Sequence, residues 1–262
     1  MKLRDYQLEA IRKMKTGCIL NGGVGSGKSL TSLSYYYMQN GGSEIFLTGG
    51  KHKKMKDPKD LYIITTARKR DTMEWEGELS HFLLSTNPDM SAYKNKVIVD
   101  SWNNVKKYKE VKGAFFIFDE QRVVGSGEWV KSFLKIAKSN EWILLSATPG
   151  DTWSDYIPVF IANGFYKNKS EFLREHAVFA RYSKFPKIEK WMGSGKLNKY
   201  RRMILVDMKF QRKTEQHHED IYVDYDIATY KDVMKNRWDI YKQEPIVNAG
   251  GLCYTLRRLV NS

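Results

Sequence analysis

The residues that most clearly could bind a ligand form one glycine-rich run near the N-terminus, Gly22-Gly23-Val24-Gly25-Ser26-Gly27-Lys28-Ser29. This run fits the pattern G-x-x-x-x-G-K-[ST] of a phosphate-binding loop, or P-loop. Glycines let a backbone curl until several N–H groups point at one phosphate, and a helix that starts there adds its dipole. Lys28 is expected to reach the β- and γ-phosphates of a nucleoside triphosphate, and the Ser29 hydroxyl to ligate Mg²⁺. The residues expected to bind the nucleotide here are Gly23, Gly25, Ser26, Gly27, Lys28 and Ser29.

Two acidic residues are the second candidate for chemistry. Asp119 and Glu120 come directly after the apolar run 114–118. An acid at the carboxyl end of a strand faces the ligand crevice of an open α/β sheet. We therefore expect Asp119 to hold Mg²⁺ together with Ser29, and Glu120 to activate an attacking water as a general base.

A third candidate is the turn Ser146-Ala147-Thr148-Pro149, which follows the apolar run 142–145. The hydroxyls of Ser146 and Thr148 are expected to bond the acidic pair and so couple nucleotide state to shape. Taken alone, a Ser/Thr turn before proline is more often only a turn.

A parallel sheet would bring these residues together. Short apolar runs of strand type occur at 18–20, 61–65, 97–100, 114–118 and 142–146, with helix-like segments between them. This alternation predicts an α/β fold with a mostly parallel sheet and helices on both faces. We expect one lobe over residues 1–226, with a surface insertion at 41–60, and then a helical segment at 227–262.

Composition narrows the class of partner. The chain has 262 residues and a net charge of +14, which favours a polyanion such as nucleic acid over a merely solubilising surface. No apolar run is long enough to span a bilayer, so no membrane partner is expected. With two cysteines and no signal-peptide pattern, the sequence favours a reducing cytoplasm over a disulfide framework.

The order of the motifs resembles a known family. A P-loop, then Asp119-Glu120 at a strand end, then Ser146-Ala147-Thr148 is similar to motifs I, II and III of superfamily-two helicases. Trp75, Glu78 and Phe82 resemble the W-x-x-E-x-x-x-F signature of the Swi/Snf-type double-stranded DNA translocases. Other similar stretches are Leu3-Arg4-Asp5-Tyr6-Gln7, Thr148-Pro149-Gly150 with Trp153, Tyr156 and Gly164-Phe165, and Leu256-Arg257-Arg258-Leu259.

This resemblance implies an N-terminal RecA-like lobe that binds ATP and Mg²⁺ and contacts nucleic acid, with compact phage-encoded helicases of this branch most similar. The cytoplasm would then be that of the phage's host. Gln7 would read adenine. The residues implied to meet the DNA backbone are Arg68, Lys69 and Arg70.

Two departures from the family pattern matter. Motif II reads Asp119-Glu120-Gln121-Arg122, so the fourth position, to which the resemblance gives a coupling role, is occupied by Arg122. In addition, the family's second RecA-like lobe, with its arginine finger, has no counterpart up to Ser262, and we expect slow ATP turnover by this lobe alone. The alternatives are a nucleotide-dependent DNA-binding module without turnover and, less consistent with the tryptophan signature, a viral packaging motor ATPase.

Overall fold

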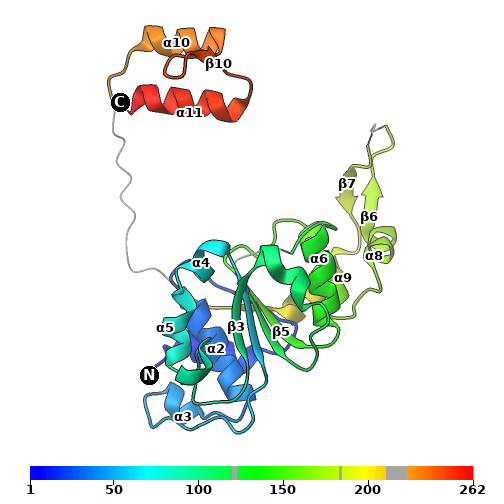
Figure 1. Cartoon of the computed structure of the whole chain (residues 1–262). Coiled ribbons are helices and arrows are strands. Elements are labelled where there is room, and N and C mark those ends of the chain that lie inside the picture. Colours follow the sequence, from blue (N-terminus) through cyan, green and yellow to red (C-terminus); the bar gives the residue numbers. More distant parts are fainter. Residues whose placement is uncertain (120–122, 183–184, 211–222, 262) are drawn as a thin grey trace. The chain divides into compact units, whose positions relative to one another are not determined.

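The computed structural model describes residues 1–119, 123–182, 185–210 and 223–261 (Figure 1). Internal contacts divide the chain into two units, Met1–Gln211 and Arg212–Ser262, and each unit is described by itself. The lobe boundary expected after residue 226 stays a prediction.

The first unit is built on a parallel sheet. Among the described residues, six strands hydrogen-bond in the order β3 (Val97–Ser101), β2 (Leu61–Thr65), β4 (Phe115–Asp119), β5 (Glu141–Ser146), β1 (Ile19–Asn21) and β8 (Leu205–Asp207). Every neighbouring pair is parallel. The predicted α/β fold with a mostly parallel sheet is therefore confirmed.

The strands are apolar on both sides because both faces of the sheet are covered. On β4, Phe115 and Ile117 pack into one core, whereas Phe116 and Phe118 pack into the other. The first core takes its helical side chains mainly from α1 (Asp5–Lys13), α2 (Lys28–Gln39) and α5 (Glu74–Ser80). The second takes them from η2 (Trp102–Tyr108), α6 (Glu128–Ala137), α7 (Trp153–Ala162), α8 (Lys169–His176) and α9 (Ser194–Ile204). Figure 1 shows α2 and α6 on opposite sides of the sheet.

The other short elements of this unit are α3 (Glu44–Leu47), α4 (Ala67–Asp71), η1 (Pro88–Met90) and an antiparallel hairpin of β6 (Ala177–Phe179) and β7 (Ile188–Trp191). None of the helices within the described ranges is both long and apolar enough to cross a membrane.

Three segments differ from the sequence-based expectation. The helix-like segment expected between the strand runs 61–65 and 97–100 is two helices, α4 and α5, because Met73 between them has a left-handed backbone with φ 53°. Segment 41–60 includes α3, capped by the Ser43 side chain, and buries Phe46 and Leu47 in the core. The basic stretch after residue 200 contains the end of α9 and the sixth strand, β8, which the sequence pattern did not indicate.

The second unit is a small helical hairpin. Its described elements are α10 (Ile227–Asn236), β9 (Trp238–Asp239), β10 (Glu244–Pro245) and α11 (Ala249–Val260). Val233, Ile246 and Leu256 form its buried core. Buried Asp239 ties the turn to α11 by accepting a hydrogen bond of 3.0 Å from the Thr255 hydroxyl. The described residues from 227 on thus form two helices with a short β-ladder between them.

Candidate nucleotide site

The glycine-rich loop connects β1 to α2 and has the backbone that its glycines allow. Gly25 and Gly27 have φ angles of 80° and 77°, in the left-handed region that disfavours other residues. A Cβ on Gly27 would also lie 2.7 Å from Nε2 of Gln7. Gly27 is the N-cap of α2, so the loop ends where the helix exposes its unsatisfied N–H groups.

The Lys28 side chain folds back over this loop. Its ammonium group donates hydrogen bonds of 2.7 Å to the carbonyl of Gly22 and 3.1 Å to the carbonyl of Gly23. These two acceptors are neutral. A phosphate oxygen carries a full negative charge and makes a stronger, charge-assisted bond, so it can compete for this ammonium.

The segment before the loop holds it from behind. The Tyr6 hydroxyl donates 3.1 Å to the carbonyl of Ser26, a residue that is itself buried. Gln7 is buried, accepts a bond from the backbone N–H of Arg4, and donates to Thr31 Oγ1 at 3.2 Å and more weakly to the Gly27 carbonyl. Gln7, expected to read adenine, therefore lies directly against the P-loop, and its adenine role stays a prediction.

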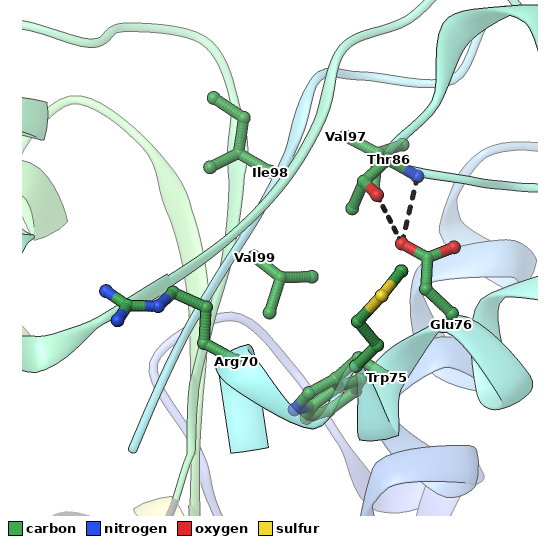
Figure 2. Close-up of a pocket in the computed structure, with 8 residues that line it drawn as sticks. Arg70, Trp75, Glu76, Thr86, Val97, Ile98 and Val99 are labelled. Carbon is green, nitrogen blue, oxygen red and sulfur yellow. Dashed lines mark hydrogen bonds between the residues drawn. The ribbon is translucent and has the colours of Figure 1, made fainter. Parts of the chain in front are cut away.

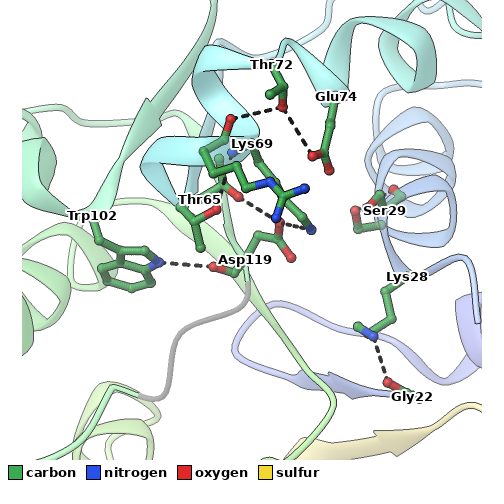
Figure 3. Close-up of polar contacts among 12 residues, drawn as sticks. Gly22, Lys28, Ser29, Thr65, Lys69, Thr72, Glu74, Trp102 and Asp119 are labelled. Atoms are coloured by element: carbon green, nitrogen blue, oxygen red, sulfur yellow. Dashed lines mark hydrogen bonds and ion pairs between the residues drawn. The ribbon is translucent and has the colours of Figure 1, made fainter. Parts of the chain in front are cut away.

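Asp119 ends β4 as a buried carboxylate, with 1% of the residue exposed. Its Oδ2 accepts 2.8 Å from the Thr65 hydroxyl and 3.0 Å from the Lys69 ammonium (Figure 3). The Trp102 indole N–H fixes its backbone by donating 3.0 Å to its carbonyl. These contacts fix one carboxylate oxygen, Oδ2, and the backbone of Asp119.

Strand order brings the loop and the carboxylate to one edge of the sheet. β5 pairs with β4 on one side and with β1 on the other, and all three run parallel. Neighbouring strands lie about 4.8 Å apart, so the carboxyl ends of β1 and β4, which are separated by β5, lie roughly 10 Å from each other. In Figure 3 Lys28, Ser29 and Asp119 face the same space. The structure therefore brings together the residues that the sequence assigned to the phosphates and to Mg²⁺.

Of the other residues expected at this edge, the structure describes Ser146 and Thr148 but not Glu120 and Arg122. Ser146 is buried at the end of β5, its carbonyl accepts from the N–H of Gly22, and its hydroxyl accepts from the N–H of Thr148. This links the Ser-Ala-Thr turn to the start of the P-loop. Glu120, expected as the general base, and Arg122, expected to couple, lie outside the described residues.

The three cations after β2 have different environments. Arg68 is exposed on α4, whereas Lys69 points to Asp119. Arg70 pairs with Asp71 at 2.8 Å and with Asp100, at the end of β3, at 3.3 Å, and both carboxylates raise its pKa. All three were expected to contact nucleic acid. Of the three, Arg68 is the one exposed to solvent, and the DNA role of each stays a prediction.

The residues of the tryptophan signature, Trp75, Glu78 and Phe82, lie on and just after α5. Trp75 and Phe82 are buried in the first core, and burial raises the pKa of Glu78. Figure 2 shows the pocket of about 280 Å³ beside it, between α4, α5 and the edge strand β3. There Glu76 accepts hydrogen bonds from the N–H and hydroxyl of Thr86. The walls of this pocket do not include the P-loop, so it is separate from the nucleotide site.

Sequence reasoning missed two residues of the site. Thr65 was read only as the last residue of a strand, and Tyr6 only as part of the stretch Leu3-Arg4-Asp5-Tyr6-Gln7, with no role at the P-loop. Thr65 hydrogen-bonds Asp119 and Tyr6 hydrogen-bonds the P-loop. A polar residue at the end of an otherwise apolar run, such as Thr65 after 61–64, is the signal that could have found it.

The described residues contain no group of three or more His, Cys, Asp and Glu side chains that could hold a metal by themselves. The oxygens of Asp119 and Ser29 suit a hard cation such as Mg²⁺, which keeps several waters and shares phosphate oxygens of its substrate. Asp119 and Ser29 are therefore the described residues of this edge that could hold such a cation.

Comparison with known proteins identifies the fold. No protein-family model matches the chain, and no curated protein matches it. Among solved structures, the SWI2/SNF2 ATPase core of Sulfolobus solfataricus in complex with double-stranded DNA matches with a TM-score of 0.56 and 18% identity, over 98% of this chain and 57% of that one. The chain therefore spans little more than half of the core that it matches.

Two further structures match less well. The Sulfolobus solfataricus SWI2/SNF2 ATPase core domain gives a TM-score of 0.49 at 17% identity, over 98% of this chain and 56% of that one. The helicase domain of Pyrococcus furiosus Hef gives 0.41 at 17% identity, over 68% and 41%. Taken with the strand order and the P-loop geometry, the first match shows that this chain has the α/β fold of a RecA-like ATPase lobe.

Proposed function

We propose that this chain is the ATP-binding lobe of a nucleic-acid-dependent ATPase, of the DNA helicase or double-stranded DNA translocase type. One observation carries the proposal: Lys28 on the P-loop and Asp119 on β4 share one edge of a parallel sheet and face the same space. Nucleotide sites of open α/β sheets lie at this edge, at the carboxyl ends of the strands.

In this proposal the P-loop binds the triphosphate of ATP. The backbone N–H groups of the loop, from Gly23 to Ser29, surround the phosphates at the start of α2. Lys28 exchanges its two carbonyl acceptors for phosphate oxygens and so neutralises negative charge there. Gln7 lies behind Gly27, in a position suited to contact a nucleotide bound at the loop.

Asp119 and Ser29 would hold Mg²⁺, directly or through water. When bound, the metal would supply positive charge that offsets the negative charge of the phosphates and so lowers the barrier to phosphoryl transfer. Thr65 orients the Asp119 carboxylate for that task, and the surrounding core excludes water from its buried side. Glu120, which follows Asp119 in the sequence, would take the proton of the attacking water.

Coupling and nucleic-acid binding complete the proposal. Ser146 and Thr148 contact each other at the end of β5, beside the P-loop, and with Arg122 would report nucleotide state to the rest of the lobe. A net charge of +14 and the exposed Arg68 support a backbone contact to duplex DNA, shared with Lys69 and Arg70. A second RecA-like lobe would be the partner that supplies an arginine to the γ-phosphate.

The test is ATP hydrolysis by the purified chain, with and without duplex DNA and with Mg²⁺ or a chelator. Hydrolysis that needs Mg²⁺ and rises with DNA would support the proposal. Because the second-lobe arginine contributes on the order of 10³ or more to such rates, we expect slow turnover from this lobe alone. Tight ATP binding without any turnover would favour the nucleotide-dependent DNA-binding module, and no ATP binding would contradict both.

A further inference from the structure

The amino ends of the strands carry a second concentration of positive charge. It comes from two segments, residues 51–60 before β2 and residues 91–96 before β3. Because the strands are parallel, both segments lie at the opposite end of the sheet from the P-loop. Figure 1 shows this separation, with α3, which leads into the first segment, and α4, which follows β2, at opposite ends of the sheet. The exposed lysines that we call the lysine surface are Lys51, Lys53, Lys54, Lys56, Lys94 and Lys96.

The two segments lie side by side. The backbone N–H of Met55, a buried residue, donates 3.2 Å to the hydroxyl of Tyr93. The side-chain amide of Asn95 donates 3.1 Å to the carbonyl of Lys59. The lysines of both segments therefore belong to one continuous surface.

The backbone of the first segment is fixed by buried side chains from the end of α2. The Tyr37 hydroxyl donates 2.7 Å to the carbonyl of Lys53. Asn40, the C-cap of α2, accepts 2.9 Å at Oδ1 from the N–H of Lys59 and 3.1 Å at its carbonyl from the N–H of Lys56. The lysine side chains thus project from an ordered backbone, so a partner would not have to order this loop in order to bind.

Carboxylates offset little of this charge. The two segments contain seven lysines and two aspartates, which leaves a net charge of +5. Lys59 is paired with Glu141 at 2.5 Å, but no lysine of the lysine surface forms an ion pair within the described part of the chain. Like charges gathered in this way repel one another, and an anionic partner would relieve that repulsion.

The chemistry of the surface favours a duplex over a single strand. Single-strand binding relies on exposed rings on which bases stack. The two rings of these segments are already packed, His52 on Phe46 with centroids 4.6 Å apart and Tyr93 against the first core. What remains exposed is a set of ammonium groups, which suits the closely spaced phosphates of a duplex and does not distinguish base sequence.

We propose that the lysine surface is a second contact for the phosphate backbone of duplex DNA, separate from the contact proposed at Arg68 on the carboxyl edge. α2 has 12 residues, so its two ends lie about 18 Å apart. The P-loop is at its start and the lysine-bearing loop at its end, so DNA on the lysine surface does not compete with nucleotide. The inference rests on the proposed function for its nucleic-acid partner, but the contact itself requires no ATP.

The test is fluorescence anisotropy of a labelled DNA duplex of mixed sequence with the whole chain, over a range of salt and without nucleotide. Lys53→Gln combined with Lys54→Gln should weaken binding about tenfold at low salt and reduce the slope of log affinity against log salt by about two. Lys53→Arg combined with Lys54→Arg keeps both charges and should stay within about twofold of the unsubstituted chain.

The matched control is Lys167→Gln combined with Lys169→Gln. It removes the same charge from exposed positions at the start of α8, a helix that packs on the other face of the sheet, and should leave the salt slope nearly unchanged. All these side chains are exposed, so the variants should fold, and circular dichroism checks this. Equal weakening by the two glutamine pairs would mean that only net charge matters and would overturn the proposal, as would unchanged binding by the first pair.

Acetylation of lysines, read by mass spectrometry, locates the contact directly. Bound duplex should protect Lys53, Lys54 and Lys96 and leave Lys169 reactive, and protection confined to lysines outside the lysine surface would also overturn the proposal. ATP binding by the glutamine variants should equal that of the unsubstituted chain. Failure of ATP binding in every chain would contradict the proposed function and leave this result standing.

Discussion

The loops after β1 and after β2 begin alike and hold their cations differently. Both follow a buried parallel strand and lead into a helix. Lys28, after β1, rests on two neutral carbonyls of its own loop. Lys69, after β2, reaches across to the buried carboxylate of Asp119 on another strand. The Gly22 and Gly23 carbonyls are neutral, so a phosphate oxygen can compete with them for Lys28, whereas withdrawing Lys69 would remove a positive charge from beside the buried Asp119 carboxylate. The first loop is thus suited to bind ligand, and the second to hold the site in shape.

This difference assigns ligand binding to the loop after β1 and support to the loop after β2, and substitutions can test it. The largest expected effect is on turnover. Glu120→Gln should lower the rate of ATP hydrolysis about 10² to 10⁴-fold with ATP affinity kept, because the amide is nearly isosteric but cannot accept a proton. Glu128→Gln, at an exposed residue at the start of α6, is the matched control and should hydrolyse normally. Equal rates of ATP hydrolysis for the two variants would show that Glu120 is not the general base.

The next effect sharpens the contrast between the two lysines. Lys69→Ala should lower the free energy of unfolding by about 1 to 3 kcal/mol in the absence of Mg²⁺, because it strips a buried carboxylate of its cation. Added Mg²⁺ should then stabilise this variant more than the unsubstituted chain. Urea unfolding measures both. Lys13→Ala removes a surface pair with Glu9 and should cost about 0.5 kcal/mol or less. If Lys69→Ala lowers the free energy of unfolding no more than Lys13→Ala does, the Lys69–Asp119 ion pair does not stabilise the fold.

A smaller effect concerns the second support, at the end of β3. Burial alone would raise the pKa of Asp100, but hydrogen bonds from Asn104, Tyr108, the backbone of Ser101 and Arg70 outweigh it and lower the pKa. A lowered pKa stabilises the fold above about pH 4 and loses that contribution as pH falls through the folded value. Asp100→Asn should therefore cost about 1 kcal/mol at neutral pH and progressively less below pH 4, measured by urea unfolding across pH.

Exposed Asp89→Asn is the control for that series and should change little at any pH. A cost for Asp100→Asn that stays constant down to pH 2 would mean that the carboxylate charge is not what stabilises the end of β3.

The smallest effect tests the exposed cation of the second loop. Arg68→Ala should weaken duplex DNA binding a few-fold at low salt and reduce the slope of log affinity against log salt by about one. Lys169→Ala is the matched control, because this exposed lysine begins α8, outside both surfaces that are proposed to contact DNA. Identical salt slopes for the two variants would remove Arg68 from the DNA contact.

The same two loops show what could be predicted from the sequence. The P-loop is a local motif, so its eight residues fix both its glycine backbone and the start of α2. The strand runs at 61–65 and 114–118 were equally clear, since a strand buried on both faces must be apolar throughout.

Lys69 could not be placed in this way. Its partner lies fifty residues away on β4, and only the pairing of β2 with β4 brings the two together. The break between α4 and α5 at Met73 and the β6–β7 hairpin likewise follow from packing and turn geometry. The spacing of apolar residues along the sequence does not reveal either.

The most direct test of the central claim, that the loop after β1 binds the phosphates of ATP, is calorimetric titration of ATP into the chain in the presence of Mg²⁺. We expect saturable binding that Lys28→Ala weakens about a hundredfold or more, since it removes charge-assisted bonds to two phosphates. Lys13→Ala, which changes a surface lysine on α1, should bind as the unsubstituted chain does. ATP affinity that is unchanged in Lys28→Ala would contradict the account.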